Sequence, residues 1–279
     1  MIPAFQKDDA LLADIAMPGG ADELRIWWLG QSGFLLRQGG SLLLIDPYLS
    51  DSLTRKYAAT DKPHTRMTEQ VIAPEKLRDI AVVTSSHNHT DHLDADTLLP
   101  LFAANPDAQF VIPEANREFV AERLGCEPSW PVGLDDGRTV IINGWQLTGI
   151  AAAHNELQTD EAGRHRFLGS IIRRGPWTLY HSGDTILYPG LAEKLAEFAV
   201  DVAFLPINGN RPERRVAGNL DGREAAQLAA DIGARWAIPH HFELFEFNTA
   251  DPSELFVPTC KTLGVAHRVM RAGEGWTVE

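Results

Sequence analysis

The segment SHNHTDHLD (86–94) places three histidines and an aspartate, His87, His89, Asp91 and His92, within six positions. Imidazole nitrogens and carboxylate oxygens are ligands that zinc and similar divalent ions accept. His87 and His89 alternate along the chain and can point to one side, while Asp91 and His92 can address a second position nearby. Two ions about 3.5–4 Å apart can activate a water jointly, so the segment predicts half of a dinuclear metal site. A histidine-rich surface loop, or core histidines satisfied by backbone groups, would explain this spaced set less well.

The other half of such a site must come from elsewhere in the chain. Three candidates stand at the ends of predicted strands: His154 at the end of LTGIAAAH, Asp184 in HSGDT and His241 after RWAIPH. Strand ends that meet at one sheet edge bring their side chains together, and an aspartate can bridge two cations. The ordinary alternatives are a surface histidine, a turn carboxylate and a histidine packed in the core. His240 competes with His241, and because neighbours in an extended segment point to opposite sides, we expect only one to reach the metals.

The elements that must position these residues alternate between strands and helices. Predicted strands cover 24–30, 33–38, 41–47, 80–86, 109–113, 139–142, 145–152, 167–174, 177–183, 201–207 and 235–240, with a hairpin turn at Asn143-Gly144, and predicted helices cover 95–104, 114–125, 221–233 and 251–264. We expect an irregular start and a polar segment at 50–76 that forms a wall or lid of the site. The whole pattern predicts one α/β domain, 1–279, of two similar halves, roughly 20–135 and 136–279, with two sheets face to face and helices outside.

Composition narrows the classes of partner. The 279 residues are 44% hydrophobic and carry a formal net charge of −13, which argues against nucleic-acid binding and leaves a small-molecule substrate. No stretch reaches the roughly 18 apolar residues of a membrane span, and the first residues do not read as an export signal. The only cysteines, Cys126 and Cys260, are too few for a disulfide scaffold, so we expect a cytoplasmic protein.

The HxHxDH cluster, the later histidines and aspartate and the order of elements resemble the metallo-β-lactamase-fold hydrolase superfamily over nearly the whole chain. Within it, the sequence is most similar to the L-ascorbate-6-phosphate lactonase group. The stretches that carry this likeness are WWLGQSGFLL (27–36), SSHNHTDHLD (85–94), LYHSGDT (179–185), DVAFLPINGN (201–210) and IPHHFELFEFNTADPSEL (238–255). The SHNHxDHLD and GDT motifs also resemble those of the phospholipase D group that hydrolyses N-acylphosphatidylethanolamine.

The resemblance implies an αββα four-layer sandwich with two mixed sheets and outer helices. It also implies two divalent ions, zinc or manganese, and a catalytic hydroxide between them that Asp91 and Asp184 orient. It places His87, His89 and His154 at the first metal, Asp91, His92 and His241 at the second, and Asp184 between them. His241 is favoured over His240 because the family's ligand normally stands two residues after the proline that ends the strand. The chain departs from the lactonase in being shorter, and His154 is less typical of the lactonase than of the superfamily.

Further residues are candidates for supporting roles. Asp46 is either a partner that orients a ligand histidine or a plain turn carboxylate before Pro47. Gln31, His181 and His240 are candidates for the cleft lining or for contacts behind the ligands. The loop NGNRPERR (208–215) groups Arg211, Arg214 and Arg215, and we name Asn208, Arg211 and Arg214 in it as substrate-binding candidates. Guanidinium groups there would clamp a phosphate or carboxylate, and the alternative is a solvated loop.

Three functions are compatible with these residues. The first is a metal-dependent hydrolase that opens a lactone or a related ester. The second is a phosphodiesterase or phospholipase-D-like hydrolase on the same site. The third is a metal-binding protein without turnover. For the enzyme, we expect a small substrate that is anionic or phosphorylated, and no membrane partner. Assembly into a homo-oligomer is compatible with the sequence.

Overall fold

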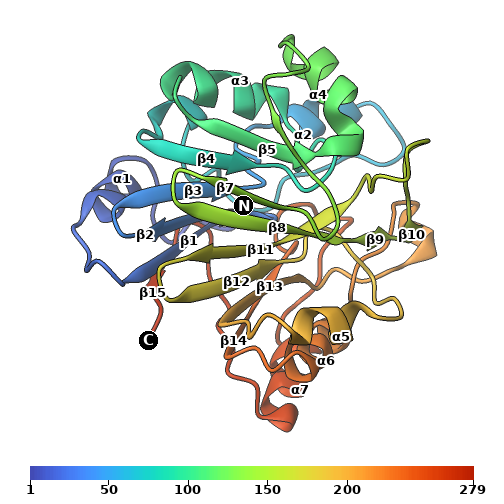
Figure 1. Ribbon diagram of the computed structural model, residues 1–279. Coiled ribbons are helices and arrows are strands. Elements are labelled where there is room, and N and C mark those ends of the chain that lie inside the picture. The colour runs from blue at the N-terminus through green and yellow to red at the C-terminus, as the bar shows by residue number, and fades with distance from the viewer.

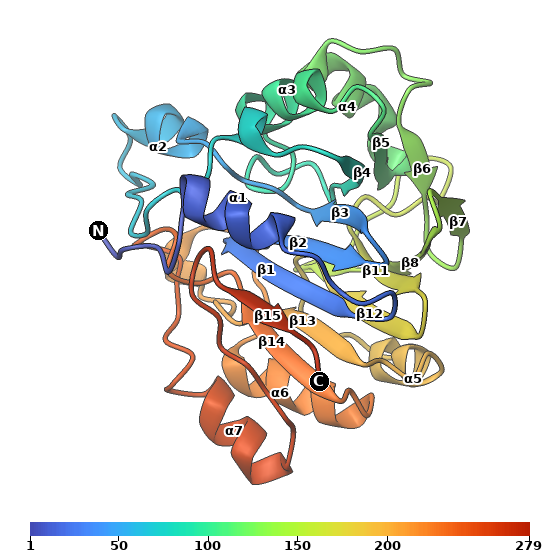
Figure 2. The same cartoon turned by 90° about the vertical axis from the view of Figure 1, so that its left-hand side faces the viewer.

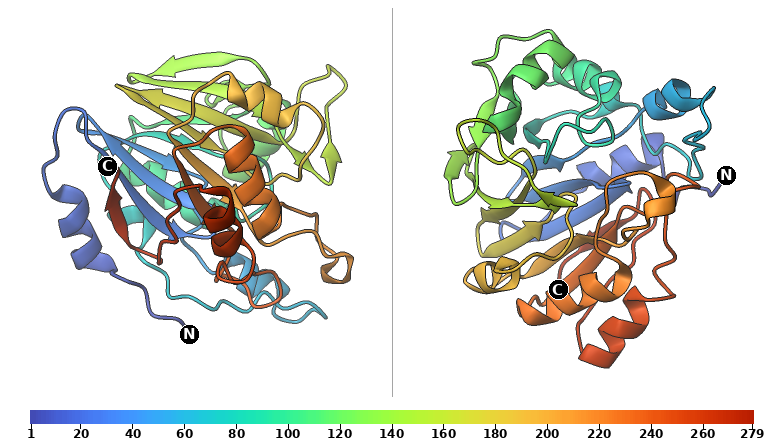
Figure 3. Two further views of the ribbon diagram at one scale, coloured as in Figure 1. Left: turned by 90° about the horizontal axis from the view of Figure 1, so that it is seen from below. Right: turned by 90° about the vertical axis from the view of Figure 1, so that its right-hand side faces the viewer.

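The computed structural model describes residues 1–279, and its first sheet comes mainly from the N-terminal part of the chain (Figure 1). Its strands, in spatial order, are β15 (Gly275–Thr277), β1 (Leu24–Gly30), β2 (Gly33–Gln38), β3 (Ser41–Ile45), β4 (Ile80–Thr84), β5 (Gln109–Pro113) and β6 (Val132–Leu134). The strands from β15 to β3 pair antiparallel, and those from β3 to β6 pair parallel. The C-terminal β15 lies beside β1, so the chain's last strand belongs to the first sheet (Figure 3).

The second sheet has six strands and repeats the change from antiparallel to parallel pairing. Its strands, in spatial order, are β14 (Trp236–His240), β13 (Val202–Pro206), β12 (Trp177–His181), β11 (Leu168–Arg174), β8 (Trp145–Ala151) and β7 (Thr139–Ile142). A small additional pair, β9 (Ala153–His154) and β10 (Glu156–Leu157), continues from β8. The parallel strands β12 to β14 share one carboxyl edge, which gathers the residues that follow them.

Helices cover the outer faces of both sheets (Figure 2). The helices are α1 (Asp8–Ala16), α2 (Ser52–Tyr57), α3 (Ala95–Ala104), α4 (Arg117–Leu124), α5 (Leu191–Ala196), α6 (Gly222–Asp231) and α7 (Phe256–Leu263), with 3₁₀ turns at Pro74–Lys76, Glu114–Asn116 and Pro212–Arg214. Because side chains alternate along a strand, Trp28 faces the core between the sheets while Trp27 packs outward with the residues under α1, α3 and α4. The predicted sandwich of two mixed sheets with outer helices is confirmed.

Three helices were not expected from the sequence. Helix α1 lies where we expected an irregular start, and side-chain contacts hold it: Asp14 accepts hydrogen bonds from Trp27 Nε1 and Gln6 Nε2, both at 2.8 Å, and pairs with Arg25. The six-residue helices α2 and α5 are similarly too short to be stable without tertiary packing. None of the helices has the length and apolar character needed to cross a bilayer.

Candidate metal centre

The 86–94 segment leaves the carboxyl end of β4 and folds back in a tight turn. The backbone N–H groups of His92 and Leu93 both donate to the carbonyl of His89, at 3.1 and 2.8 Å. The turn returns His92 to the side of His87, and their ring centroids are 4.0 Å apart. The turn therefore gathers the first four candidate ligands within one short segment.

The three candidates outside this segment reach the same place from other strand ends. His154 ends β9, Asp184 follows β12 and His241 follows β14. His154 Nδ1 lies 2.9 Å from the carbonyl of Gly218; a carbonyl only accepts, so Nδ1 carries the proton and Nε2 is left to face Asp184. His241 has a left-handed φ of 60°, and its N–H donates to the carbonyl of Gln31 at 3.0 Å.

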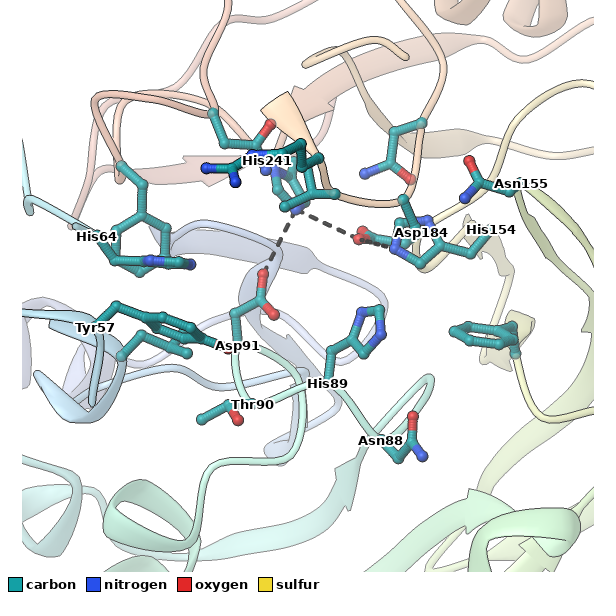
Figure 4. A pocket seen from close by; sticks show the side chains of 18 of the residues that line it. Tyr57, His64, Asn88, His89, Thr90, Asp91, His154, Asn155, Asp184 and His241 are labelled. Carbon is teal, nitrogen blue, oxygen red and sulfur yellow. Dashed lines mark ion pairs between the residues drawn. The ribbon is translucent and has the colours of Figure 1, made fainter. Parts of the chain in front are cut away.

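Asp184 lies between the histidines of both predicted sites (Figure 4). Its Oδ1 is 3.4 Å from His92 Nε2, and its Oδ2 is 3.6 Å from His154 Nε2 and 3.3 Å from His241 Nε2. Asp91 Oδ2 is 3.5 Å from His241 Nε2. These separations suit neighbouring ligands of one ion, since tetrahedral bonds of about 2.1 Å place ligand atoms about 3.4 Å apart.

The possible ligand atoms fall into triads. Within each triad, the atoms lie within 4.8 Å of one another: His87, His89 and His154; Asp91, His92 and His241; and His87, His92 and Asp184. The first two triads correspond to the two metal positions expected from the sequence, and the third joins them through Asp184.

Several atoms at this centre are buried and have no hydrogen-bond partner in the protein. They include His87 Nε2, His92 Nε2 and Asp184 Oδ1. Burying a polar atom unpaired is costly, so groups of this kind usually have an additional partner such as an ion. Imidazole and carboxylate donors that converge in this way fit divalent ions such as zinc or manganese.

The electrostatics of the cluster also favour a cation. Burial lowers the pKa of His87 well below its ordinary value, and neighbouring histidines act in the same direction. Burial also lowers the pKa of His92, but the carboxylates of Asp184 and Asp91 outweigh it and raise the pKa well above its ordinary value. The same competition raises the pKa of His241 to about 9. Cation binding at His92 and His241 is therefore coupled to proton release.

Asp46 lies behind the cluster as an orienting partner. Its Oδ2 is 2.6 Å from His92 Nδ1, and both side chains are fully buried. Ser86, which the sequence analysis did not single out, donates from its backbone N–H to Asp46 Oδ1 at 2.8 Å and from its hydroxyl to Oδ2. Of the two interpretations of Asp46, the orienting partner is the one that agrees with these contacts.

Gln31 contacts the cluster at Asp91 and His241. Its Nε2 donates to Asp91 Oδ2 at 2.9 Å and lies 3.1 Å from His241 Nε2. The side chain is buried and Oε1 has no partner. Gln31 thus touches two candidate ligands rather than the open part of the cleft.

His181 and His240 lie behind the ligands and do not line the cleft. Their rings stack with centroids 4.8 Å apart, and both are buried next to Phe34. His181 is held by the Ser32 carbonyl, which lies 3.0 Å from its Nε2, and by the N–H of Gly183, which donates to Nδ1. The structure thus brings His241, and not His240, to Asp91 and Asp184, which is the choice that the family resemblance favoured.

The contacts of the 208–215 loop correct part of its predicted role in substrate binding. Arg214 Nη2 donates to the carbonyl of Thr249 at 2.7 Å, and Nη1 donates to the carbonyl of Asn208 and to Asn248 Oδ1. Asn208 Nδ2 also donates to Asn248 Oδ1, at 3.0 Å. Neither residue lines the cavity described below, nor does the exposed Arg211. These contacts tie two loops together, which leaves Arg214 unavailable as a clamp for substrate.

A cavity of about 640 Å³ opens over the cluster. Five basic side chains line it: Lys56, Lys62, Arg123, Arg166 and Arg215. Its only carboxylates are Asp91 and Asp184. Sequence reasoning missed most of this lining because the five residues come from four separated segments, and no local spacing connects them. The 50–76 segment does contribute to the wall, through α2 and the turn after it.

Comparisons with known proteins agree with this geometry. A family model described as "Beta-lactamase superfamily domain" matches residues 42–242. A UPF0173 metal-dependent hydrolase from Rubrobacter xylanophilus is 29% identical over an alignment 262 residues long, which covers 90% of this chain and 95% of that protein.

Solved structures share the fold at lower identity. Igni18, a metallo hydrolase from Ignicoccus hospitalis, has a TM-score of 0.67 and 22% identity over 92% of this chain and 99% of its own. CmlA, a diiron β-hydroxylase from Streptomyces venezuelae, has a TM-score of 0.66 and 17% identity over 94% of this chain and 55% of its own. Because the family match covers well over half of the residues, the chain belongs to the β-lactamase superfamily.

Proposed function

We propose that this protein is a metal-dependent hydrolase that opens a lactone or a related ester. The observation that carries the proposal is the set of seven converging ligands, with buried donor atoms that lack partners in the protein. The names of the curated relatives as metal-dependent hydrolases support it. The fold alone would not, because CmlA is described as a hydroxylase.

The seven residues expected from the sequence and the family resemblance would hold two divalent ions, zinc or manganese, and Asp184 would be a ligand common to both positions. When bound, such ions lower the pKa of water to about 7 and polarise the bond to be broken. Asp91 and Asp184 orient the attacking water. Gln31 fixes Asp91 through the 2.9 Å hydrogen bond, and Asp46 fixes His92. These contacts hold the side chains in position before substrate arrives.

The lining favours a small, anionic substrate. It carries five basic side chains against two carboxylates, in a chain whose formal net charge is −13. A carboxylate or phosphate on the substrate would find in this cavity the positive field that the rest of the protein lacks. The lactonase resemblance makes a sugar-acid lactone the first class to test. Cytoplasmic location and homo-oligomer formation stay predictions.

The test compares activity with metal content. Protein purified without added metal is analysed for its elements and then assayed, with zinc or manganese, on a panel of neutral and anionic lactones. We expect turnover of at least one lactone by the wild type and none by Asp184→Ala. Metal binding without turnover of any ester would favour the non-catalytic alternative and overturn the proposal.

A phosphodiesterase is the second candidate, because the same basic lining would also suit a phosphodiester. Bis(4-nitrophenyl) phosphate and an N-acyl phospholipid belong in the same panel. Faster turnover of either, relative to every lactone, would move the assignment to this class.

A further inference from the structure

His64 is a histidine of the cavity that belongs to none of the three ligand triads. It lies after α2, is only 8% exposed, and lines the same cavity as Asp91 and His241 (Figure 4). Three aromatic rings surround it. Tyr57 stacks on it at a centroid distance of 4.1 Å, and Phe247 and Phe245 meet it edge to face at 4.5 and 5.3 Å.

The protein fixes the ring's tautomer. Nδ1 lies 3.1 Å from the carbonyl of Lys62, which can only accept, so Nδ1 carries the hydrogen. The carbonyl of His64 is held in turn by the hydroxyl of Thr54, at 2.7 Å. Nε2 makes no hydrogen bond within the protein, yet it is not among the atoms shielded from solvent. Because so little of the side chain reaches the outside, the solvent that reaches Nε2 is that of the cavity.

The ring is suited to accept a hydrogen bond at neutral pH. Burial lowers the pKa of His64 below its ordinary value, although the Lys62 carbonyl and the negative charge of Asp91 oppose this. A neutral ring with the hydrogen on Nδ1 has a lone pair on Nε2. Packing alone does not explain this choice of residue, since phenylalanine would fill the aromatic cluster without exposing a polar atom to the cavity.

We propose that His64, with Tyr57, Phe245 and Phe247, forms a second substrate-recognition subsite in the cavity. There, Nε2 accepts a hydrogen bond from a hydroxyl or N–H group of the substrate, while the aromatic rings contact the apolar frame that carries this group. The inference rests on the proposed function and narrows its substrate class to anionic molecules that also bear a hydrogen-bond donor. His64 thereby acts as a specificity residue, apart from the ligands that serve the chemistry.

The test measures binding and is independent of turnover. The probes are 3- and 4-hydroxybenzoate and their methyl ethers, because the carboxylate suits the basic lining and only the hydroxyl can donate. Isothermal titration of the metal-loaded full chain should show the wild type binding at least one hydroxy acid roughly fivefold more tightly than its ether, as expected for one hydrogen bond. In His64→Phe, that preference should disappear.

Two further variants separate recognition from folding. His64→Gln keeps an acceptor oxygen and should recover part of the preference. His165→Phe removes a histidine outside the cavity and should leave it unchanged. Metal content and melting temperature are measured for each variant. The proposal is overturned if His64→Phe keeps the wild-type preference, or if the wild type shows no preference or binds none of the probes. If the wild type shows the preference but turns over no ester, the result would instead count against the proposed function.

Discussion

Asp46 Oδ2 and His92 Nδ1 lie 2.6 Å apart, and neither side chain is exposed. The carboxylate accepts the Nδ1 hydrogen, which fixes the ring and directs Nε2 toward Asp184. Asp46 itself has a left-handed φ of 41°, a conformation that aspartate and asparagine tolerate better than most residues. The position therefore serves both the turn after β3 and the orientation of a ligand.

Asp46→Asn should weaken metal binding while the fold persists. Asparagine keeps the shape and tolerates the backbone conformation, but it loses the charge that strengthens His92 as a ligand. The expected loss in metal affinity is about 10- to 100-fold, measured by competition with a chromogenic chelator. Asp201→Asn removes a carboxylate that contacts Thr178 and Arg235 instead, and it should leave the affinity unchanged. Equal affinity in wild type and Asp46→Asn would contradict this role.

The structure brings the candidate ligands together as expected from the sequence, because each position depends on local rules. The HxHxDH spacing is compact, and His154, Asp184 and His241 each follow a strand whose pattern is readable. For these three residues, the inference needed only the direction of each strand and the edge at which it ends. Alternation along an extended segment predicted that only one of His240 and His241 would reach the metals, and the family resemblance favoured His241.

The cavity walls could not be predicted in the same way, because they depend on how distant segments pack. Arg166 and His64 stand about a hundred positions apart and face one cavity. The sequence suggested that Arg214, like Arg211, could bind substrate. Its guanidinium instead donates hydrogen bonds to the carbonyl of Thr249 and to neighbouring groups. Helix α1 was missed for a related reason, since its contacts with β1 are long-range.

Arg123 should stabilise the ligand-bearing turn. From α4, its Nη1 donates to the carbonyls of Asn88 and Leu93, at 2.8 and 2.9 Å, which flank the turn, while the guanidinium lies 4.4 Å from the Phe119 ring. Arg123→Met keeps the apolar stem and removes the donors. Since hydrogen bonds from a charged group contribute roughly 1.5–3 kcal/mol, we expect faster amide exchange in the turn and weaker metal binding.

The matched control for that variant is Arg173→Met. Arg173 also packs on an aromatic ring, that of Phe198, and donates to its carbonyl at 3.1 Å, but it lies on β11 away from the cavity. Hydrogen exchange and metal titration on both proteins compare the two positions. If both substitutions lowered metal affinity equally, Arg123 would have no specific role at the turn.

Gly183→Ala should damage both stability and the position of Asp184. A Cβ at Gly183 would lie 2.7 Å from the carbonyl oxygen of Leu168 and 2.8 Å from Ser86 Cβ, at a φ of +58°. The backbone conformation alone costs alanine about 1–2 kcal/mol, and the contacts add roughly 1–3 kcal/mol. Gly125→Ala separates these effects, because Gly125 has a φ of +64° and nothing within 4 Å of its Cβ. Denaturant unfolding should rank the Gly183 variant as less stable, and only that variant should lose metal affinity.

Removing metal should destabilise the whole fold. The ligands come from strand ends in both sheets, so an ion that binds them binds only the folded chain. At a free concentration 100 times the dissociation constant, it contributes about 2.7 kcal/mol, or a rise of roughly 5 °C or more in Tm. Calorimetry of chelator-treated protein with and without zinc measures this rise, and Asp184→Ala should reduce it. An unchanged Tm on adding zinc or manganese to metal-free wild type would argue against a metal centre.

Arg166 should govern the affinity for the anionic part of the substrate. It lines the cavity, is partly buried, and makes no ion pair or hydrogen bond through its guanidinium, so the group is free to meet a ligand. Arg166→Gln should raise KM for a carboxylated or phosphorylated lactone by roughly tenfold or more, with a much smaller effect on a neutral lactone and on kcat. Arg211→Gln tests the residue first suggested by the sequence; being exposed and outside the cavity, it should leave both constants unchanged. Steady-state kinetics on the charged and the neutral lactone decide between the two arginines. A KM that rises only in Arg211→Gln would restore Arg211 as the residue that binds the anionic group.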